Sequence, residues 1–212
     1  MNSIFDEIRK YKIVPVIKLE KPSDAFRLGR ALLEGGLPVA EVTFRTAAAR
    51  DAIKLLREQY PAMMVGAGTV TTIEQVDLAR DAGAMFIVTP GFNPRIVDYC
   101  LANNIIIIPG VNSPSQIEQG LERGLSLLKF FPAEASGGVK MLKALHGPYS
   151  EVSFVPTGGI DASNLLQYIQ LSNVAAIGGS WMVKEDLISS GQFDVISRLC
   201  GEALTIVRQS HT

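Results

Sequence analysis

Short apolar runs alternate with segments of helical periodicity from one end of the chain to the other. The run Lys12–Leu19 (KIVPVIKL) has the length of a buried strand, and Pro22–Glu34 after it repeats apolar residues at helical spacing. The further strands expected are Val39–Arg45, Met63–Val70, Met85–Pro90, Ile105–Pro109, the run from Leu125 that stops at Pro132, Val152–Pro156 and Val174–Ile177. The further helices expected are Ala47–Gln59, Ile73–Ala82, Pro94–Asn103, Ser115–Arg123, Gly138–Leu145, Ala162–Leu171 and one within Phe193–Arg208.

This alternation predicts the α/β class. Strands that are each followed by a helix pair in parallel, because the helix carries the chain back across the sheet. About eight such units fit a closed (β/α)8 TIM barrel, and an open doubly wound sheet is the rival architecture. No linker or composition shift divides the chain, so residues 1–212 are expected to form a single domain, with a short helical segment before the first strand.

Composition narrows the range of functions. The 212 residues are 47% hydrophobic and carry a formal net charge of -1, with no basic cluster, which disfavours a nucleic-acid partner. No apolar run approaches the roughly 20 residues that span a bilayer. The first seven residues also lack the basic start and apolar core of a signal peptide, so a cytoplasmic protein without a membrane partner is expected.

Cysteine and histidine usage gives no sign of a metal or a disulfide. Cys100 and Cys200 stand alone without ligand-like spacing, and we expect both to be reduced thiols. His146 and His211 are the only histidines, and neither belongs to a metal-type cluster. Zinc is therefore disfavoured, and the Schiff-base chemistry considered below would need no cofactor.

A lysine interrupts the apolar run Leu125–Pro132 (LSLLKFFP). Burying an ammonium group is costly, and desolvation favours the neutral amine, which can attack a carbonyl and form a Schiff base. Lys129 is therefore a candidate nucleophile. The alternative is that its side chain points outward and extends its amine to water.

Several expected strands end in small or turn-forming residues. These tips are Gly66–Thr69, Thr89–Gly91, Pro109–Gly110, Pro156–Gly159 and Gly178–Ser180. In a barrel they would lie together at the carboxyl-terminal face, where such enzymes build their sites. Each tip alone is also consistent with ordinary turn chemistry. The glycines after the seventh and eighth strands suggest a phosphate site, because loops at this place in barrels commonly bind phosphate through backbone N–H groups.

A glutamate stands inside the second expected strand. Side chains alternate along a strand, so Glu41, Thr43 and Arg45 share one face. If that face looks into the barrel mouth, it offers an acid/base, a hydroxyl and a guanidinium that can bind a carboxylate. The alternative for Glu41 is a buried structural ion pair. Lys129 and Glu41 together form the pairing that imine chemistry requires.

Six motifs resemble those of the bacterial KDPG/KHG aldolases, the 2-keto-3-deoxy-6-phosphogluconate and 4-hydroxy-2-oxoglutarate aldolases. The resemblance runs in order along nearly the whole chain. The motifs are Glu41–Thr46 (EVTFRT), Gly66–Val70 (GAGTV), Thr89–Gly91 (TPG), Lys129–Glu134 (KFFPAE), Pro156–Ile160 (PTGGI) and Gly178–Trp181 (GGSW).

The resemblance implies a metal-independent class I aldolase, a lyase, that acts on a small 2-keto acid and assembles as a homotrimer. By position, Lys129 matches the Schiff-base lysine and Glu41 the general acid/base. Residues that match the pyruvate end of the site are Arg45, Thr69, Pro90 and Phe131. Residues that match the phosphate end are Thr157, Gly158, Gly159, Gly179 and Ser180.

Other functions stay open at the level of the sequence. The aldehyde product is glyceraldehyde 3-phosphate or glyoxylate, depending on the substrate, and 2-keto-3-deoxy-6-phosphogalactonate is a further substrate to consider. A phosphosugar isomerase or epimerase on the same barrel would use the glycine tips without needing a buried lysine. A metal-dependent aldolase and a non-catalytic sugar-phosphate binding protein are less consistent with the lysine and glutamate.

Overall fold

The computed structural model describes residues 4–209, so His211 and the first three residues of the N-terminal segment lie outside the described part of the chain. The described strands are β1 (Ile13–Ile17), β2 (Val39–Thr43), β3 (Met64–Gly68), β4 (Ile87–Val88), β5 (Ile107–Ile108), β6 (Gly110–Val111), β7 (Leu127–Phe130), β8 (Ser153–Pro156) and β9 (Ile177–Gly179). The described helices are α1 (Ile4–Tyr11), α2 (Asp24–Glu34), α3 (Ala49–Gln59), α4 (Ile73–Asp81), α5 (Pro94–Ala102), α6 (Pro114–Leu121), α7 (Gly138–His146), α8 (Leu165–Ile169), α9 (Glu185–Ser189) and α10 (Phe193–Gln209), with short 3-10 helices η1 (Glu134–Ser136) and η2 (Trp181–Val183).

All the paired strands run parallel, which confirms the predicted α/β class. One sheet has the order β5-β4-β3-β2-β1-β9, and a second has the order β6-β7-β8. Single bridges join Phe154 to Val174 and Thr157 to Gly178, so β8 approaches β9. The strands therefore form two parallel sheets. The predicted barrel is confirmed only in part, because these sheets do not join into one continuous eight-stranded sheet.

The division between the sheets falls at Pro109. The sequence pattern predicts one strand over Ile105–Pro109, whereas the structure has β5 before the proline and β6 after it. Proline has no N–H to donate to a neighbouring strand, so it interrupts the ladder at this point. Its carbonyl still accepts a hydrogen bond from Lys129 N–H at 2.9 Å.

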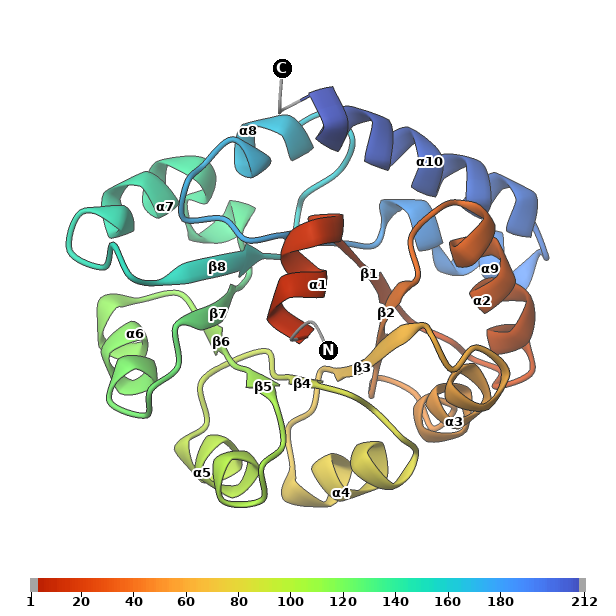
Figure 1. Cartoon of the computed structure of the whole chain (residues 1–212), viewed down its shortest axis with the longest axis horizontal. Coiled ribbons are helices and arrows are strands. Elements are labelled where there is room, and N and C mark those ends of the chain that lie inside the picture. The colour runs from red at the N-terminus through yellow and green to blue at the C-terminus, as the bar shows by residue number, and fades with distance from the viewer. Residues whose placement is uncertain (1–3, 210–212) are drawn as a thin grey trace.

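Alternate strand residues enter two separate hydrophobic cores. Ala40 and Val42 of β2 pack outward against the helices, while Val39 of the same strand packs inward. The inner core gathers side chains from the amino-terminal ends of several strands, and Ile8 of α1 packs against them. Figure 1 shows the consequence: helices surround the strands, and α1 lies across the middle of the ring.

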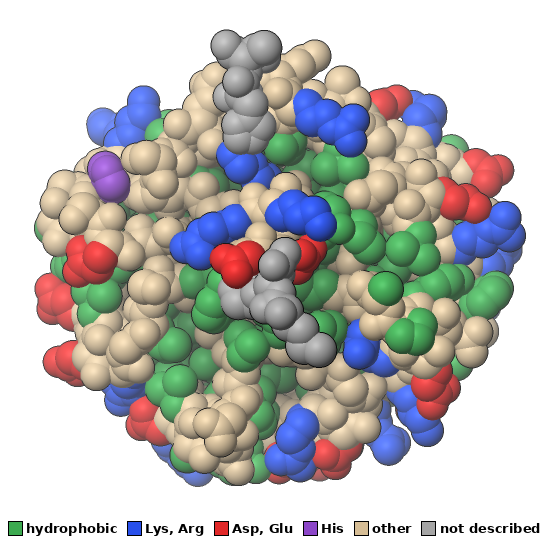
Figure 2. Space-filling model, in the orientation of Figure 1, with side chains coloured by type: hydrophobic (Ala, Val, Ile, Leu, Met, Phe, Trp, Pro, Cys, Tyr) green, Lys and Arg blue, Asp and Glu red, His purple; other side chains and the backbone are tan. Residues whose placement is uncertain are grey.

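The inner core leaves the opposite ends of the strands free for polar side chains. Because all the strands are parallel, their carboxyl ends meet at one edge, away from α1. Figure 2 shows the face that carries α1, where acidic and basic side chains are interspersed rather than gathered by sign. Among residues 4–209, no helix has both the length and the apolar character needed to cross a membrane.

The predicted elements differ from the structure mainly in the last third of the chain. Val174–Ile177 is predicted as the last strand, but β9 begins only at Ile177 and continues into Gly179. The predicted helix Ala162–Leu171 is shortened to α8, since Asp161 to Asn164 form a turn whose side chains bond to nearby backbone N–H groups. The sequence pattern also missed α9, which has only five residues.

Candidate active site

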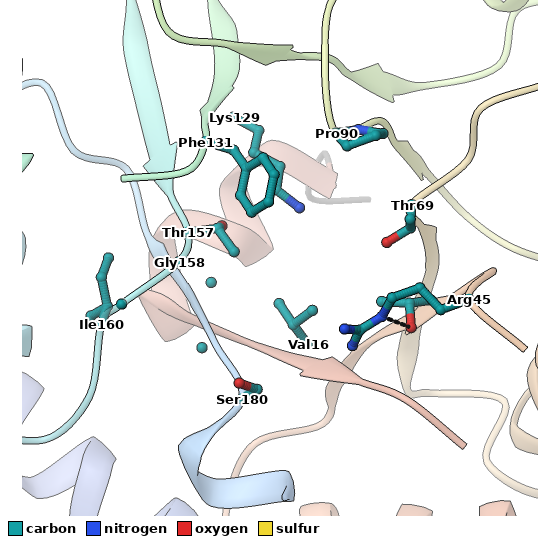
Figure 3. Close-up of a pocket in the computed structure, with 14 residues that line it drawn as sticks. Val16, Arg45, Thr69, Pro90, Lys129, Phe131, Thr157, Gly158, Ile160 and Ser180 are labelled. Carbon is teal, nitrogen blue, oxygen red and sulfur yellow. Dashed lines mark hydrogen bonds between the residues drawn. The ribbon is translucent and has the colours of Figure 1, made fainter. Parts of the chain in front are cut away.

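A cavity of about 280 Å³ opens at the carboxyl ends of the strands. Ten of the eleven site residues predicted from the sequence line it, and they come from strands or strand tips far apart in the chain. Figure 3 shows the amine of Lys129 pointing into the cavity, with Thr69 and Arg45 on one side and Thr157 and Gly158 on the other. The eleventh predicted residue, Glu41, is buried beside the amine.

Lys129 and Glu41 meet at the centre of the site. The Lys129 Nζ lies 3.2 Å from Glu41 Oε1, and the two side chains are 6% and 4% exposed. The lysine therefore points into the ring of strands, and the alternative of an outward-pointing side chain is wrong. The two residues come from β7 and β2, and they are 88 positions apart in the sequence.

A glycine on the neighbouring strand makes room for the Glu41 carboxylate. Gly68 of β3 pairs in register with Thr43 of β2, and a Cβ added at Gly68 would collide with the Glu41 carboxylate. Any side chain at this position would push the carboxylate from its place beside Lys129. The glycine of the GAGTV motif therefore has a packing role in the site.

Two side chains lie against the amine of Lys129. Glu41 Oε1 accepts a hydrogen bond from Nζ at 3.2 Å. The aromatic ring of Phe131 lies beside the amine as well, with 5.3 Å between Nζ and the ring centroid. The geometry therefore provides a carboxylate that can accept the proton when the amine attacks.

Arg45 is oriented by Thr43, which the alternation along β2 places on the same face. The Arg45 Nε donates to Thr43 Oγ1 at 3.1 Å, and the Thr43 hydroxyl in turn donates to the carbonyl of Ile17 at 2.9 Å. Thr43 is buried, whereas Arg45 is exposed at the cavity mouth (Figure 3). The guanidinium is thus held at the edge of the cavity, where it can bind an incoming carboxylate.

Thr69 has an uncommon backbone conformation at the cavity wall. Its φ is 56°, in the left-handed region that β-branched residues rarely adopt. Strained residues of this kind cluster at ligand sites, where the surrounding structure holds them in place. Here the conformation places the Thr69 side chain at the cavity, facing the Lys129 amine (Figure 3).

The opposite side of the cavity is built from backbone. Gly158 and Gly159 have φ values of 103° and 77°, which glycine adopts readily. The carbonyl of Gly158 accepts a hydrogen bond from the Glu134 N–H, and that of Gly159 accepts one from the Asn164 amide, so the loop is held at the cavity edge. Backbone N–H groups gathered in a turn form an anion-binding concavity. Helix termini contribute less here, because α8 begins only at Leu165 and η2 is a single short turn.

Neither cysteine belongs to this site. Cys100 and Cys200 are buried in the outer core and are free thiols. Burial raises the pKa of the Cys100 thiol to about 11 and that of Cys200 to about 12, so both remain protonated at neutral pH. Among the described residues, no three His, Cys, Asp or Glu side chains group as metal ligands would.

Sequence reasoning missed three residues of the cavity wall, namely Val16, Ile160 and Gly178. Thr43 also lines the cavity, as its place on the same strand face as Glu41 predicted. The same alternation was a usable signal for Val16, which lies on the same face as the inner-core residue Val14. Ile160 and Gly178 belong to motifs already recognised, but nothing local shows which motif positions face the cavity.

Comparisons with known proteins agree on one family. A model of the "KDPG and KHG aldolase" family matches residues 4–199. The chain is 52% identical over 207 residues to a 2-dehydro-3-deoxy-phosphogluconate aldolase of Haemophilus influenzae, covering 98% of each protein. It is 43% identical over 192 residues to the KHG/KDPG aldolase of Escherichia coli, covering 91% of this chain and 90% of that protein.

A solved structure extends the agreement to the fold. The KDPG aldolase of Legionella pneumophila, with pyruvate captured at low pH as a covalent carbinolamine intermediate, superimposes with a TM-score of 0.92 at 40% identity. The similarity covers 95% of this chain and 98% of that one. By its sequence and its fold, the chain belongs to the KDPG and KHG aldolase family.

Proposed function

We propose that this protein is a class I aldolase that cleaves 2-keto-3-deoxy-6-phosphogluconate to pyruvate and glyceraldehyde 3-phosphate. The observation that carries the proposal is a buried lysine amine 3.2 Å from a buried carboxylate at the bottom of an open cavity. The family membership and the covalent pyruvate intermediate of the Legionella pneumophila relative support the same chemistry.

The first half of the reaction joins substrate to enzyme. A proton passes from the Lys129 ammonium to Glu41, and the neutral amine attacks the C2 ketone to give a carbinolamine. Glu41 then returns a proton to the C2 oxygen, which leaves as water, and a positively charged iminium remains. Arg45 and Thr69 hold the substrate carboxylate beside the amine. Pro90 and Phe131 exclude water around the reacting carbon.

The second half breaks the carbon–carbon bond. Glu41, directly or through one water, removes the proton of the C4 hydroxyl, the C3–C4 bond opens, and its electron pair moves into the iminium to form an enamine. The aldehyde departs, C3 is protonated, and water hydrolyses the resulting iminium to free pyruvate and Lys129. The protonated imine serves as the electron sink, so this route needs no metal or cofactor.

Thr157, Gly158, Gly159, Gly179 and Ser180 form the phosphate end of the site in this proposal. The placement of Thr157 and Gly158 across the cavity from Arg45 suits a substrate with a carboxylate at one end and a phosphate at the other (Figure 3). A second substrate, 4-hydroxy-2-oxoglutarate, shares the pyruvate end, and the name of the Escherichia coli relative includes it. Cleavage of that substrate releases glyoxylate and makes no use of the phosphate end.

Trapping with borohydride tests the proposal. Incubation with pyruvate and borohydride should leave a stable adduct on Lys129, located by peptide mass spectrometry. The Lys129→Met protein should form none. Lys18→Met is the matched control, since Lys18 lies at the same rim with its amine paired to Glu20 and Glu185, and it should label normally. Absence of an adduct in the wild type, or its presence at another lysine, contradicts the mechanism.

We further infer that residues 1–212 form a single closed (β/α)8 barrel, in which β5 and β6 count as one strand and the bridges to β9 complete the ring. By analogy with the family, we infer a homotrimer that acts in the cytoplasm. Light scattering on the purified protein tests the trimer, and a monomer in solution contradicts it.

A further inference from the structure

A buried tyrosine and a glutamate form a pair directly behind the glycine loop after β8. The hydroxyl of Tyr168, in α8, donates a hydrogen bond to Glu134 Oε1. Tyr168 is fully buried, and neither residue lines the cavity. Burial, with the hydrogen bond to Glu134, raises the pKa of Tyr168 above its ordinary value, so the hydroxyl keeps its proton and remains a donor.

Glu134 is tied to the glycine loop through its backbone. The N–H of Ala133 donates to the carbonyl of Thr157 at 2.8 Å, and the N–H of Glu134 donates to the carbonyl of Gly158 at 3.1 Å. These bonds join the turn after β7 and the start of η1 to the loop after β8. A shift of Glu134 would therefore be passed to the glycine loop.

The Glu134 side chain also packs directly against the loop. A Cβ added at Gly159 would lie 2.7 Å from Glu134 Cγ and 2.8 Å from its Cβ. The left-handed conformation of Gly159 is thus held against the stem of the glutamate. Two independent contacts, one through backbone and one through side chain, connect Glu134 to the glycine loop that lines the cavity.

The placement of the carboxylate resolves an electrostatic conflict. A carboxylate next to a loop that binds anions would compete for its N–H groups. Here Glu134 Oε1 lies beside Gly138 at the start of α7, since a Cβ added at Gly138 would be 3.0 Å from that oxygen and 2.9 Å from the Tyr168 hydroxyl. The amino-terminal end of a helix attracts negative charge. Tyr168 and α7 therefore hold the carboxylate away from the loop.

We propose that Glu134 and Tyr168 are positioning residues that set the conformation of the Gly158–Gly159 loop for the phosphate of the substrate. Neither residue touches the substrate in this proposal. Their pairing fixes the stem of Glu134 under Gly159 and keeps its charge at α7. The inference rests on the proposed function, because it assigns a substrate phosphate to this loop.

The test compares a phosphorylated substrate with an unphosphorylated one. In Tyr168→Phe, the KM for 2-keto-3-deoxy-6-phosphogluconate should rise about tenfold, the effect expected for one lost hydrogen bond to a charged group. Its kcat should change little, because the contact acts on binding rather than on the chemical step. Both constants for 4-hydroxy-2-oxoglutarate should stay at wild-type values. Inhibition by inorganic phosphate should weaken in parallel with the rise in KM.

Two further variants make the test specific. Glu134→Gln keeps a side-chain oxygen that accepts a hydrogen bond from Tyr168. Its KM for 2-keto-3-deoxy-6-phosphogluconate should therefore stay close to that of the wild type. Tyr149→Phe is the matched control, because Tyr149 likewise donates to a glutamate, Glu118, at 2.9 Å but makes no contact with the glycine loop. This control should leave both substrates unaffected.

The proposal is overturned if Tyr168→Phe affects both substrates equally, affects neither, or behaves like Tyr149→Phe. A Glu134→Gln enzyme as weak as Tyr168→Phe overturns it too. Failure of the proposed function looks different, since the wild-type protein would then form no borohydride adduct with pyruvate. Binding of inorganic phosphate, followed by calorimetry, still reports on the loop in that case.

Discussion

At the scale of single residues, Lys129 and Glu41 depend on each other. Considered alone, a lysine in an apolar run lowers the stability of the folded state, because burying its charge is unfavourable. Its removal would therefore be expected to leave the fold intact. The ion pair reverses this expectation, since each group compensates the buried charge of the other. Breaking a buried pair by removing one partner is more destabilising than replacing both.

This dependence predicts the stability of two variants. Lys129→Met should lower the free energy of unfolding at neutral pH by about 3 to 5 kcal/mol, because it leaves Glu41 buried without a partner. The double variant Lys129→Met, Glu41→Gln should recover a large part of that loss, although it is inactive. Urea denaturation of the wild type, the single variants and the double variant measures this. Equal stability of Lys129→Met and the double variant contradicts the prediction.

At the scale of elements, the site depends on how neighbouring strands face each other. Glu41 and Gly68 lie on adjacent parallel strands, and their inward faces meet inside the ring. A glycine at this point in β3 leaves the space that the carboxylate fills. The small residues at the strand ends thus have different roles. In the GAGTV motif, Gly68 makes room for the Glu41 carboxylate in addition to ending the strand.

This difference predicts contrasting effects of two glycine substitutions. Gly68→Ala should displace the Glu41 carboxylate, lower kcat/KM strongly and cost about 1 to 3 kcal/mol of stability, as overpacking does. Gly91→Ala, at the next strand tip, should be close to neutral, since a Cβ there meets nothing within 4 Å. Steady-state kinetics and thermal denaturation of both variants check this. Similar losses in the two would contradict a specific role for Gly68.

At the scale of the whole molecule, stability and chemistry occupy opposite ends of the strand ring. The inner core and α1 fill the amino-terminal ends, and the cavity lies at the carboxyl-terminal ends. Ile8 is 1% exposed at the centre of this inner core. Changes in α1 should therefore affect stability without altering the site.

Ile8→Ala tests this separation. It should lower the free energy of unfolding by about 2 to 5 kcal/mol, the range for a buried isoleucine. At temperatures where the variant stays folded, its KM and kcat should match the wild type. Lys10→Ala, an exposed position on the same helix, should change stability by no more than about 0.5 kcal/mol. A change in the KM of Ile8→Ala would show that the two ends are coupled.

The order and type of most elements follow from local patterns, so the sequence by itself predicted the α/β class and the positions of most helices and strands. It also marked the residues of the site, because a charged group in an apolar run and glycines at strand tips are unusual within a short stretch. The break at Pro109, the short α9 and the late start of β9 were missed, since their local signals are weak.

Only the tertiary structure decided which of these residues meet. The contact of Lys129 with Glu41 joins positions 88 apart, and that of Tyr168 with Glu134 joins positions 34 apart. Their distances depend on how strands from different parts of the chain are placed around one ring. Local periodicity tells which face a side chain takes, but it carries no information on the partner across the ring. For that reason the sequence named Glu41 as the proton partner of Lys129 but only the fold gave their contact, and the support of the glycine loop by Glu134 and Tyr168 came from the fold alone.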